Sequence, residues 1–127
     1  SQNVLIRPGI PYSEVPETLE KFDIFINTSN YDTAPRSILE AMANGLCIVT
    51  TDVGGIPWLV KDRSEAFLVP PNDPKEMAGA IRRILNQPGL ASILSTNAGK
   101  SATKYDWSVI LPDWEKLFLG VIKKDHV

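Results

Sequence analysis

The sequence predicts an α/β domain in which helices cover both faces of a parallel sheet. The first observation is the alternation of short apolar, β-branched runs with amphipathic segments, joined by short connections. The second is the length of 127 residues, which matches one domain of ordinary size. The third is composition: 43% hydrophobic and 22% charged residues are close to globular averages, which excludes a disordered or fibrous chain.

Four apolar runs are predicted as strands, and the segments between and after them as helices. Ser13 caps the first helical segment, and Pro16 is tolerated in its first turn. Pro35 opens the second helix, and Gly45 stands where a glycine usually ends one. The second strand is apolar enough to be covered on both faces. The predicted strands are residues 4–6, 23–27, 46–50 and 66–69, and the helical segments are residues 13–22, 35–44, 58–60, 75–85, 89–104 and from there to 124.

Charge and residue counts exclude several classes of function. Thirteen Lys and Arg against fifteen Asp and Glu give a net charge of -2, which argues against a sequence-neutral nucleic-acid binder. One cysteine, Cys47, and one histidine, His126, exclude a disulfide framework, zinc sites and serine–histidine triads, so no metal site is expected. Cys47 lies in an apolar strand and is expected to be a buried, inert thiol.

The start shows no signal peptide and no initiator methionine, so we expect a piece of a longer protein.

The candidate site lies in the loop and helix after the second strand. Ligands of parallel sheets bind outside the carboxyl ends of the strands, where helix N-termini favour anions. Asp32 ends the loop, and Glu40 follows eight residues later on the helix. Arg36, Glu40 and Asn44 share one polar stripe, so both carboxylates are expected to face one cleft. The opposite, core-facing side carries Ile38, Leu39 and Met42.

A simpler interpretation of these residues stays open from spacing alone. Asp32 or Thr33 caps the helix in this interpretation, and Glu40 pairs with Arg36 one turn earlier. The glycines Gly54 and Gly55 likewise allow two interpretations, a phosphate-binding loop or an ordinary turn.

Three stretches of the chain resemble the C-terminal domain of glycosyltransferase family 4. They are residues 39–45 (LEAMANG), 53–57 (VGGIP) and 67–74 (FLVPPNDP), and the similarity extends from Val4 to about Ile122. The resemblance implies a Rossmann-like parallel sheet flanked by helices, a truncated C-terminal half of a GT-B fold. Residues 1–127 then form a single partial domain that binds a nucleotide sugar.

The resemblance also implies roles for individual residues. The family signature is two glutamates separated by seven residues. The second falls on Glu40, implying hydrogen bonds to the ribose hydroxyls of the nucleotide. The first falls on Asp32, one methylene shorter, whose counterpart contacts the donor sugar near its reacting face. Asp32 is therefore the candidate catalytic residue, with an aspartate where the family has a glutamate.

The remaining candidate donor-binding residues act through their backbone. The family often has a glycine-rich stretch where this chain has Thr33-Ala34-Pro35. The resemblance places the backbone of Thr33 and Ala34 toward the sugar hydroxyls, and that of Arg36 and Ser37 toward the diphosphate. Ile10 matches a position whose backbone meets the base.

The function implied is that of a retaining, metal-independent transferase with no cofactor beyond its substrate. It moves a sugar from a UDP- or GDP-sugar to a carbohydrate or lipid-linked acceptor. We expect a cytoplasmic location, with peripheral contact at the inner face of the membrane as an alternative. The chain alone lacks the acceptor domain and is expected to be inactive and to self-associate. Two other functions stay open, a non-catalytic assembly or regulatory module from a degenerate paralogue and a flavodoxin-like binding module.

An apolar stripe at helical spacing marks the last helix. It is predicted to be a packing face, and three nearby lysines allow a weaker membrane-surface interpretation. The stripe is Trp107, Ile110, Leu111, Trp114, Leu117, Phe118 and Val121, and the lysines are Lys116, Lys123 and Lys124.

Overall fold

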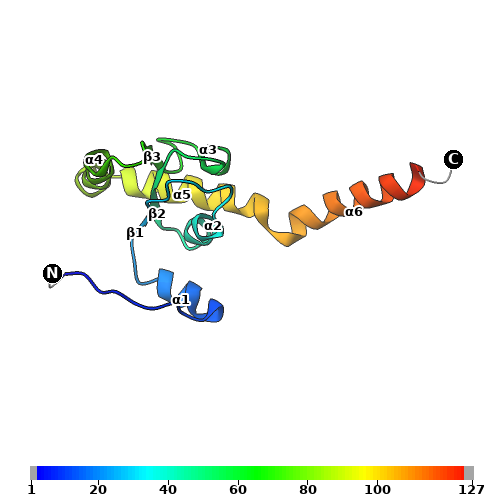
Figure 1. Ribbon diagram of the computed structural model, residues 1–127, viewed down its shortest axis with the longest axis horizontal. Helices are drawn as coiled ribbons and strands as arrows, with labels where there is room; N and C mark the ends of the chain where they lie inside the picture. Colours follow the sequence, from blue (N-terminus) through cyan, green and yellow to red (C-terminus); the bar gives the residue numbers. More distant parts are fainter. Residues whose placement is uncertain (1–2, 125–127) are drawn as a thin grey trace.

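A three-stranded parallel sheet lies at the centre of the computed structural model, which describes residues 3–124 (Figure 1). The strands are β1 (Ile24–Asn27), β2 (Cys47–Thr51) and β3 (Phe67–Val69), in the order β1–β2–β3. Ile24 lies opposite Cys47, and Val49 lies opposite Phe67. The predicted parallel sheet is confirmed, with three of the four predicted strands.

The predicted strand at residues 4–6 is wrong. Val4, Leu5 and Ile6 are 67%, 75% and 87% exposed and lie outside the sheet. An apolar, β-branched run becomes a strand only where a neighbouring strand offers hydrogen-bonding groups, and these residues have no such neighbour in the part of the chain described. The outer edge of β1 has no partner strand among residues 3–124 either. Ile26 is 46% exposed, so β1 is not covered on both faces as expected.

Helices cover the two faces of the sheet, so β2 is buried along its whole length, and its side chains point alternately to the two sides. Ile48 points toward α2 (Arg36–Ala43) and α3 (Ile56–Leu59) and packs in one cluster with Ile38, Met42 and Leu59. Val49 points the other way, toward α4 (Pro74–Asn86). The helix α5 (Leu90–Ala102) contributes Leu94 to the second cluster and Ala98 to the first, so it ties both layers together.

Side-chain caps begin some of the helices and not others. The Asp73 carboxylate caps α4 by accepting the N–H groups of Lys75 and Glu76 at 3.1 and 3.0 Å. In the first helical segment, η1 (Tyr12–Glu14) leads into α1 (Val15–Leu19) and no side chain caps either element. The predicted cap at Ser13 is therefore wrong, because the chain enters the helix through a tight turn that leaves this hydroxyl exposed.

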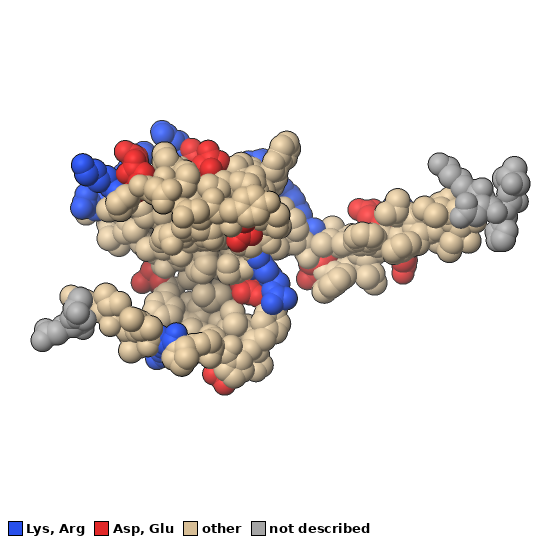
Figure 2. Space-filling view, in the orientation of Figure 1, with Lys and Arg blue, Asp and Glu red and all other residues tan. Residues whose placement is uncertain are grey.

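The last helix, α6 (Trp107–Lys124), follows η2 (Thr103–Tyr105) and projects away from the body of the protein (Figure 1). The face of α6 seen in Figure 2 is mostly uncharged, with a few acidic side chains. The predicted apolar side chains are present, but most of them are exposed, and only Ile110 at the start of the stripe is partly buried. Trp107, Trp114 and Phe118 are 73%, 49% and 58% exposed. No helix among the described residues is long and apolar enough to cross a membrane.

Candidate functional site

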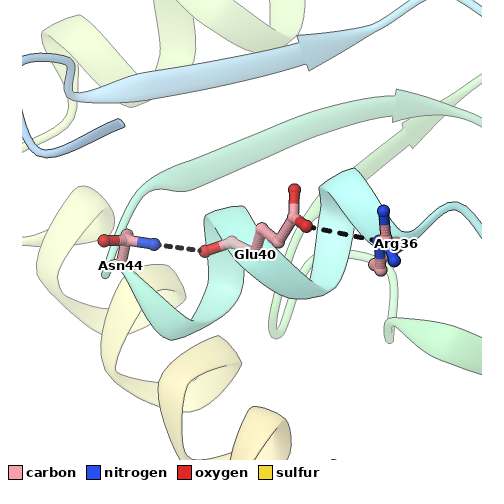
Figure 3. Close-up of polar contacts among 3 residues, drawn as sticks. All are labelled: Arg36, Glu40 and Asn44. Carbon is pink, nitrogen blue, oxygen red and sulfur yellow. Dashed lines mark hydrogen bonds and ion pairs between the residues drawn. The ribbon is translucent and has the colours of Figure 1, made fainter. Parts of the chain in front are cut away.

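A polar stripe runs along α2, as predicted, and Figure 3 shows its three side chains. Arg36 Nε lies 3.4 Å from Glu40 Oε1, and Asn44 Nδ2 donates to the main-chain oxygen of Glu40 at 2.8 Å. Ile38 and Met42 on the other side of the helix are fully buried. The stripe exists because three- and four-residue spacing keeps polar groups on one side and core residues on the other. The predicted ion pair between Arg36 and Glu40 is confirmed.

The Glu40 carboxylate is not satisfied by this ion pair. Its Oε1 atom is buried and accepts no hydrogen bond from any described residue. The Arg36 side chain is 74% exposed, whereas that of Glu40 is 22% exposed, so water weakens the attraction between them. Most buried carboxylate oxygens in proteins accept at least one hydrogen bond. Glu40 Oε1, the oxygen that faces Arg36, is therefore an acceptor that no hydrogen bond among the described residues satisfies.

Two pockets meet at Glu40. A pocket of 170 Å³ lies between α2 and the first helical segment, and Tyr12, Pro16 and Asn44 help to line it. The Arg36 guanidinium lies over the Tyr12 ring at 4.7 Å, and this cation–π contact holds the first segment against α2. Ile10, two residues before Tyr12, is half-buried. No local sequence pattern indicates this contact, because the two residues lie far apart in the chain.

The second pocket is a groove of 530 Å³ on the other side of Glu40. Leu39 and Ala43 of α2, with Trp107 of α6, give it apolar walls. Asp106 stands at its edge and caps α6 by accepting the N–H of Ser108 at 2.8 Å. Hydrogen bonds from the hydroxyl and then the amide of Ser108 lower the pKa of Asp106.

Asp32 lies in the loop after β1, where the glycine pair holds its backbone. The Gly55 N–H donates to the Asp32 main-chain oxygen at 3.0 Å. A Cβ at Gly54 would stand 1.8 Å from that oxygen, and one at Gly55 would stand 1.7 Å from the Thr33 oxygen. Only glycine permits this approach of two backbones. The pair thus acts as a support for the Asp32 loop, a role that the sequence interpretation missed.

The simpler interpretation that Asp32 or Thr33 caps α2 is wrong. Pro35 is the N-cap residue, and no side chain caps this helix. Thr33, Ala34, Arg36 and Ser37 are all exposed around its first turn. Pro35 itself is buried and fixes the entry of the chain into the helix.

The two carboxylates are not brought into one pocket. Glu40 lines both pockets described above, and Asp32 lines neither. Asp32 is half-buried at the carboxyl end of the sheet, whereas Glu40 lies in the middle of α2. The two carboxylates thus line no common pocket among those described, and the expectation that both face one cleft stays a prediction.

Cys47 is a core residue, as expected. It is 4% exposed, and its Sγ lies 3.4 Å from the Ala91 main-chain oxygen. Burial, and then the charge of Asp23, raises the pKa of the Cys47 thiol. A raised pKa disfavours the thiolate that a nucleophile requires.

Solved glycosyltransferases share this fold. Sucrose-phosphate synthase from Thermosynechococcus elongatus superimposes with a TM-score of 0.89 over 97% of this chain and 31% of that protein, at 25% identity. The Anabaena protein HepE, solved in complex with UDP-glucose, superimposes with a TM-score of 0.79 over 84% of this chain and 30% of that one, at 23% identity. The fold is thus the Rossmann-like α/β arrangement of GT-B glycosyltransferases.

The chain belongs to the family of glycosyl transferases group 1, whose model matches residues 1–102. An N,N'-diacetylbacillosaminyl-diphospho-undecaprenol alpha-1,3-N-acetylgalactosaminyltransferase of Campylobacter jejuni is 31% identical over 87% of this chain. An alpha-D-kanosaminyltransferase of Streptomyces kanamyceticus is 32% identical over 83% of it. The chain spans 30% and 28% of these two relatives.

Proposed function

We propose that this chain is the donor-binding part of a retaining, metal-independent glycosyltransferase of family 4. In this proposal the enzyme moves a sugar from a UDP- or GDP-sugar to a carbohydrate or lipid-linked acceptor. The observation that supports it most directly is the buried Glu40 Oε1, which accepts no hydrogen bond from the described residues. A carboxylate in this state matches vicinal ribose hydroxyls, which donate two hydrogen bonds to its two oxygens.

The neighbouring backbone suits the rest of a nucleotide sugar. The first turn of α2 has no side-chain cap, so the N–H groups of Arg36 and Ser37 are suited to the diphosphate. The exposed backbone of Thr33 and Ala34 is suited to the sugar hydroxyls. Ile10 lies just before the segment whose Tyr12 contacts Arg36 of α2. This position suits a contact between the Ile10 backbone and the nucleotide base.

In the proposed reaction, one region of the protein stabilises the leaving diphosphate and another contacts the transferred sugar. Developing negative charge on the leaving diphosphate is stabilised by N–H groups and basic side chains, in place of a metal ion. Asp32 contacts the sugar near its reacting carbon, and the glycine pair beneath it keeps its backbone fixed. The main acceptor site belongs to a domain outside these 127 residues, in keeping with the 30% of the Campylobacter relative that the chain spans.

The first test is a nucleotide-binding screen of this chain by calorimetry with UDP, GDP, ADP and CMP. We expect UDP or GDP to bind and the others to bind more weakly. Equal, weak binding of all four would favour a flavodoxin-like module instead. Donor hydrolysis by the complete enzyme is the second test, and its absence despite nucleotide binding would favour the non-catalytic paralogue.

Asp32→Asn is expected to lower kcat about a hundredfold while the KM for the donor changes only a few-fold. The substitution removes the charge but keeps the size, and the bond from Gly55 to the main-chain oxygen is unaffected. The assay is donor turnover by the complete enzyme. Asp52→Asn, at an exposed aspartate in the neighbouring loop, is the control and should match wild type. Wild-type turnover by Asp32→Asn would exclude a catalytic role for Asp32.

The chain on its own is expected to form dimers through α6 and to transfer no sugar. Exposed apolar side chains along one helix pair readily with a second copy. Light scattering coupled to size exclusion at several concentrations measures the mass. Leu117→Glu, at a residue 57% exposed, should give a monomer, and Lys116→Glu should leave the dimer intact. A wild-type chain that stays monomeric at high concentration would contradict this prediction.

A further inference from the structure

A small pocket with an exposed tryptophan at its mouth lies beside the proposed donor site. Trp58 on α3 is 90% exposed, although tryptophan is among the residues with the largest buried area in folded proteins. Its neighbours Ile56 and Leu59 are buried and fix the short helix against the core. Trp58 therefore stands on a rigid base, with its ring in solvent.

The pocket measures 80 Å³ and combines aromatic walls with a carboxylate. Trp58 and Tyr105 line it, and Tyr105 is 39% exposed. Glu65 also lines it and is only 6% exposed. The two Glu65 oxygens accept hydrogen bonds from Ser101 Oγ at 2.6 Å and from the Lys61 N–H at 3.0 Å. Each oxygen keeps a free lone pair for a further donor.

The charges around the pocket restrict the ligand. The ammonium groups of Lys61 and Lys104 belong to exposed residues that line it. Two aromatic rings beside a carboxylate suit a cation, but these two positive charges oppose a cationic ligand. The Glu65 carboxylate likewise opposes an anion, which leaves a neutral polyol. Its hydroxyls donate to Glu65 and accept from the lysines, while its C–H face lies flat on the Trp58 indole.

The pocket adjoins the site already described on two sides. Tyr105 lines both this pocket and the groove beside Glu40. On the other side, α3 begins directly after Gly55, whose N–H donates to the Asp32 oxygen. A sugar held on Trp58 is thus near the loop where Asp32 is proposed to act.

We propose that Trp58, Tyr105 and Glu65 form a subsite for a pyranose ring of a carbohydrate acceptor, an assignment that rests on the proposed transferase function. The pocket takes one edge of the ring, and the Trp58 indole carries its face. Trp58 thereby becomes a determinant of which acceptor the enzyme accepts.

The test uses the 127-residue chain and the indole N–H signals of its three tryptophans in ¹H–¹⁵N NMR spectra. The probes are the methyl α-pyranosides of glucose, galactose and mannose, with choline chloride as the cationic control. We expect at least one pyranoside to shift the Trp58 signal saturably, with the Trp107 and Trp114 signals unmoved. Trp58→Ala should weaken that binding about tenfold or more, as followed by the backbone N–H signals of Glu65 and Tyr105 in the same spectra, and Trp114→Ala, at a tryptophan 49% exposed, should not.

The inference is overturned if no pyranoside shifts the Trp58 signal, if choline binds more tightly, or if Trp58→Ala binds pyranosides normally. A parallel titration with UDP and GDP separates this failure from failure of the proposed function. Nucleotide binding without pyranoside binding removes the subsite and leaves the donor site. Pyranoside binding at Trp58 without nucleotide binding leaves the subsite and removes the donor site.

Discussion

Gly55→Ala is expected to destabilise the chain by about 2–4 kcal/mol and to displace the Asp32 loop. The new Cβ would stand 1.7 Å from the Thr33 main-chain oxygen and 2.8 Å from its carbon. Both neighbours are backbone atoms, so no flexible side chain can yield. Overpacking of this kind costs about 1–3 kcal/mol, and loss of the bond from Gly55 to Asp32 adds about 1 kcal/mol.

The control for this prediction is Gly79→Ala in the middle of α4. Nothing lies within 4 Å of a Cβ there, so the change should stabilise the chain by up to about 1 kcal/mol through helix propensity. Urea denaturation of both variants measures the difference. If Gly55→Ala unfolds at the wild-type urea concentration, the Asp32 loop moves freely and the glycine pair is not its support.

The sheet and the polar stripe could be predicted because both depend on local patterns. The stripe needs only the helical period of α2, and β2 needs only a short apolar run. Its burial follows from helices on both faces. The strand predicted at residues 4–6 had the same local signal, yet strand formation depends on a partner that no short window contains. The same limit applies to α6, whose stripe was predicted correctly while its cover is absent among the described residues.

The candidate site was predictable only in part, for a related reason. Glu40 was identified by its spacing and by family resemblance, and its unsatisfied oxygen is a property of the folded surroundings. Contacts between distant segments left no local pattern. Arg36 on Tyr12 and Ser101 on Glu65 pair side chains that a fold, not a motif, brings together. The glycine pair was visible in the sequence as a turn or loop, but only the fold shows that it packs against the backbone of Asp32.

Glu40→Gln is expected to weaken UDP or GDP binding by about 1.5–3 kcal/mol, or about 10- to 150-fold, because the charged acceptor for the ribose hydroxyls is lost. Glu40→Ala should lose at least as much. Calorimetry on the 127-residue chain gives the affinities, and Glu76→Gln, at an exposed glutamate of α4, should bind as wild type does. Unchanged affinity in Glu40→Gln would mean that Glu40 serves only as the partner of Arg36.

In Glu40→Gln the nucleotide affinity should fall while the free energy of unfolding stays the same or rises. This difference distinguishes a ligand-binding carboxylate from a structural one. The Glu40 Oε1 atom is buried without a hydrogen bond, which costs folding free energy, and its ion pair with the exposed Arg36 returns little. Replacing the charge should therefore leave the free energy of unfolding within about 1 kcal/mol of wild type, or raise it. A structural ion pair predicts the reverse, with stability lost and nucleotide affinity kept. Urea denaturation and calorimetry of the same Glu40→Gln sample distinguish a ligand-binding carboxylate from a structural one. A residue retained for binding can lower the free energy of unfolding, whereas a residue retained for structure raises it.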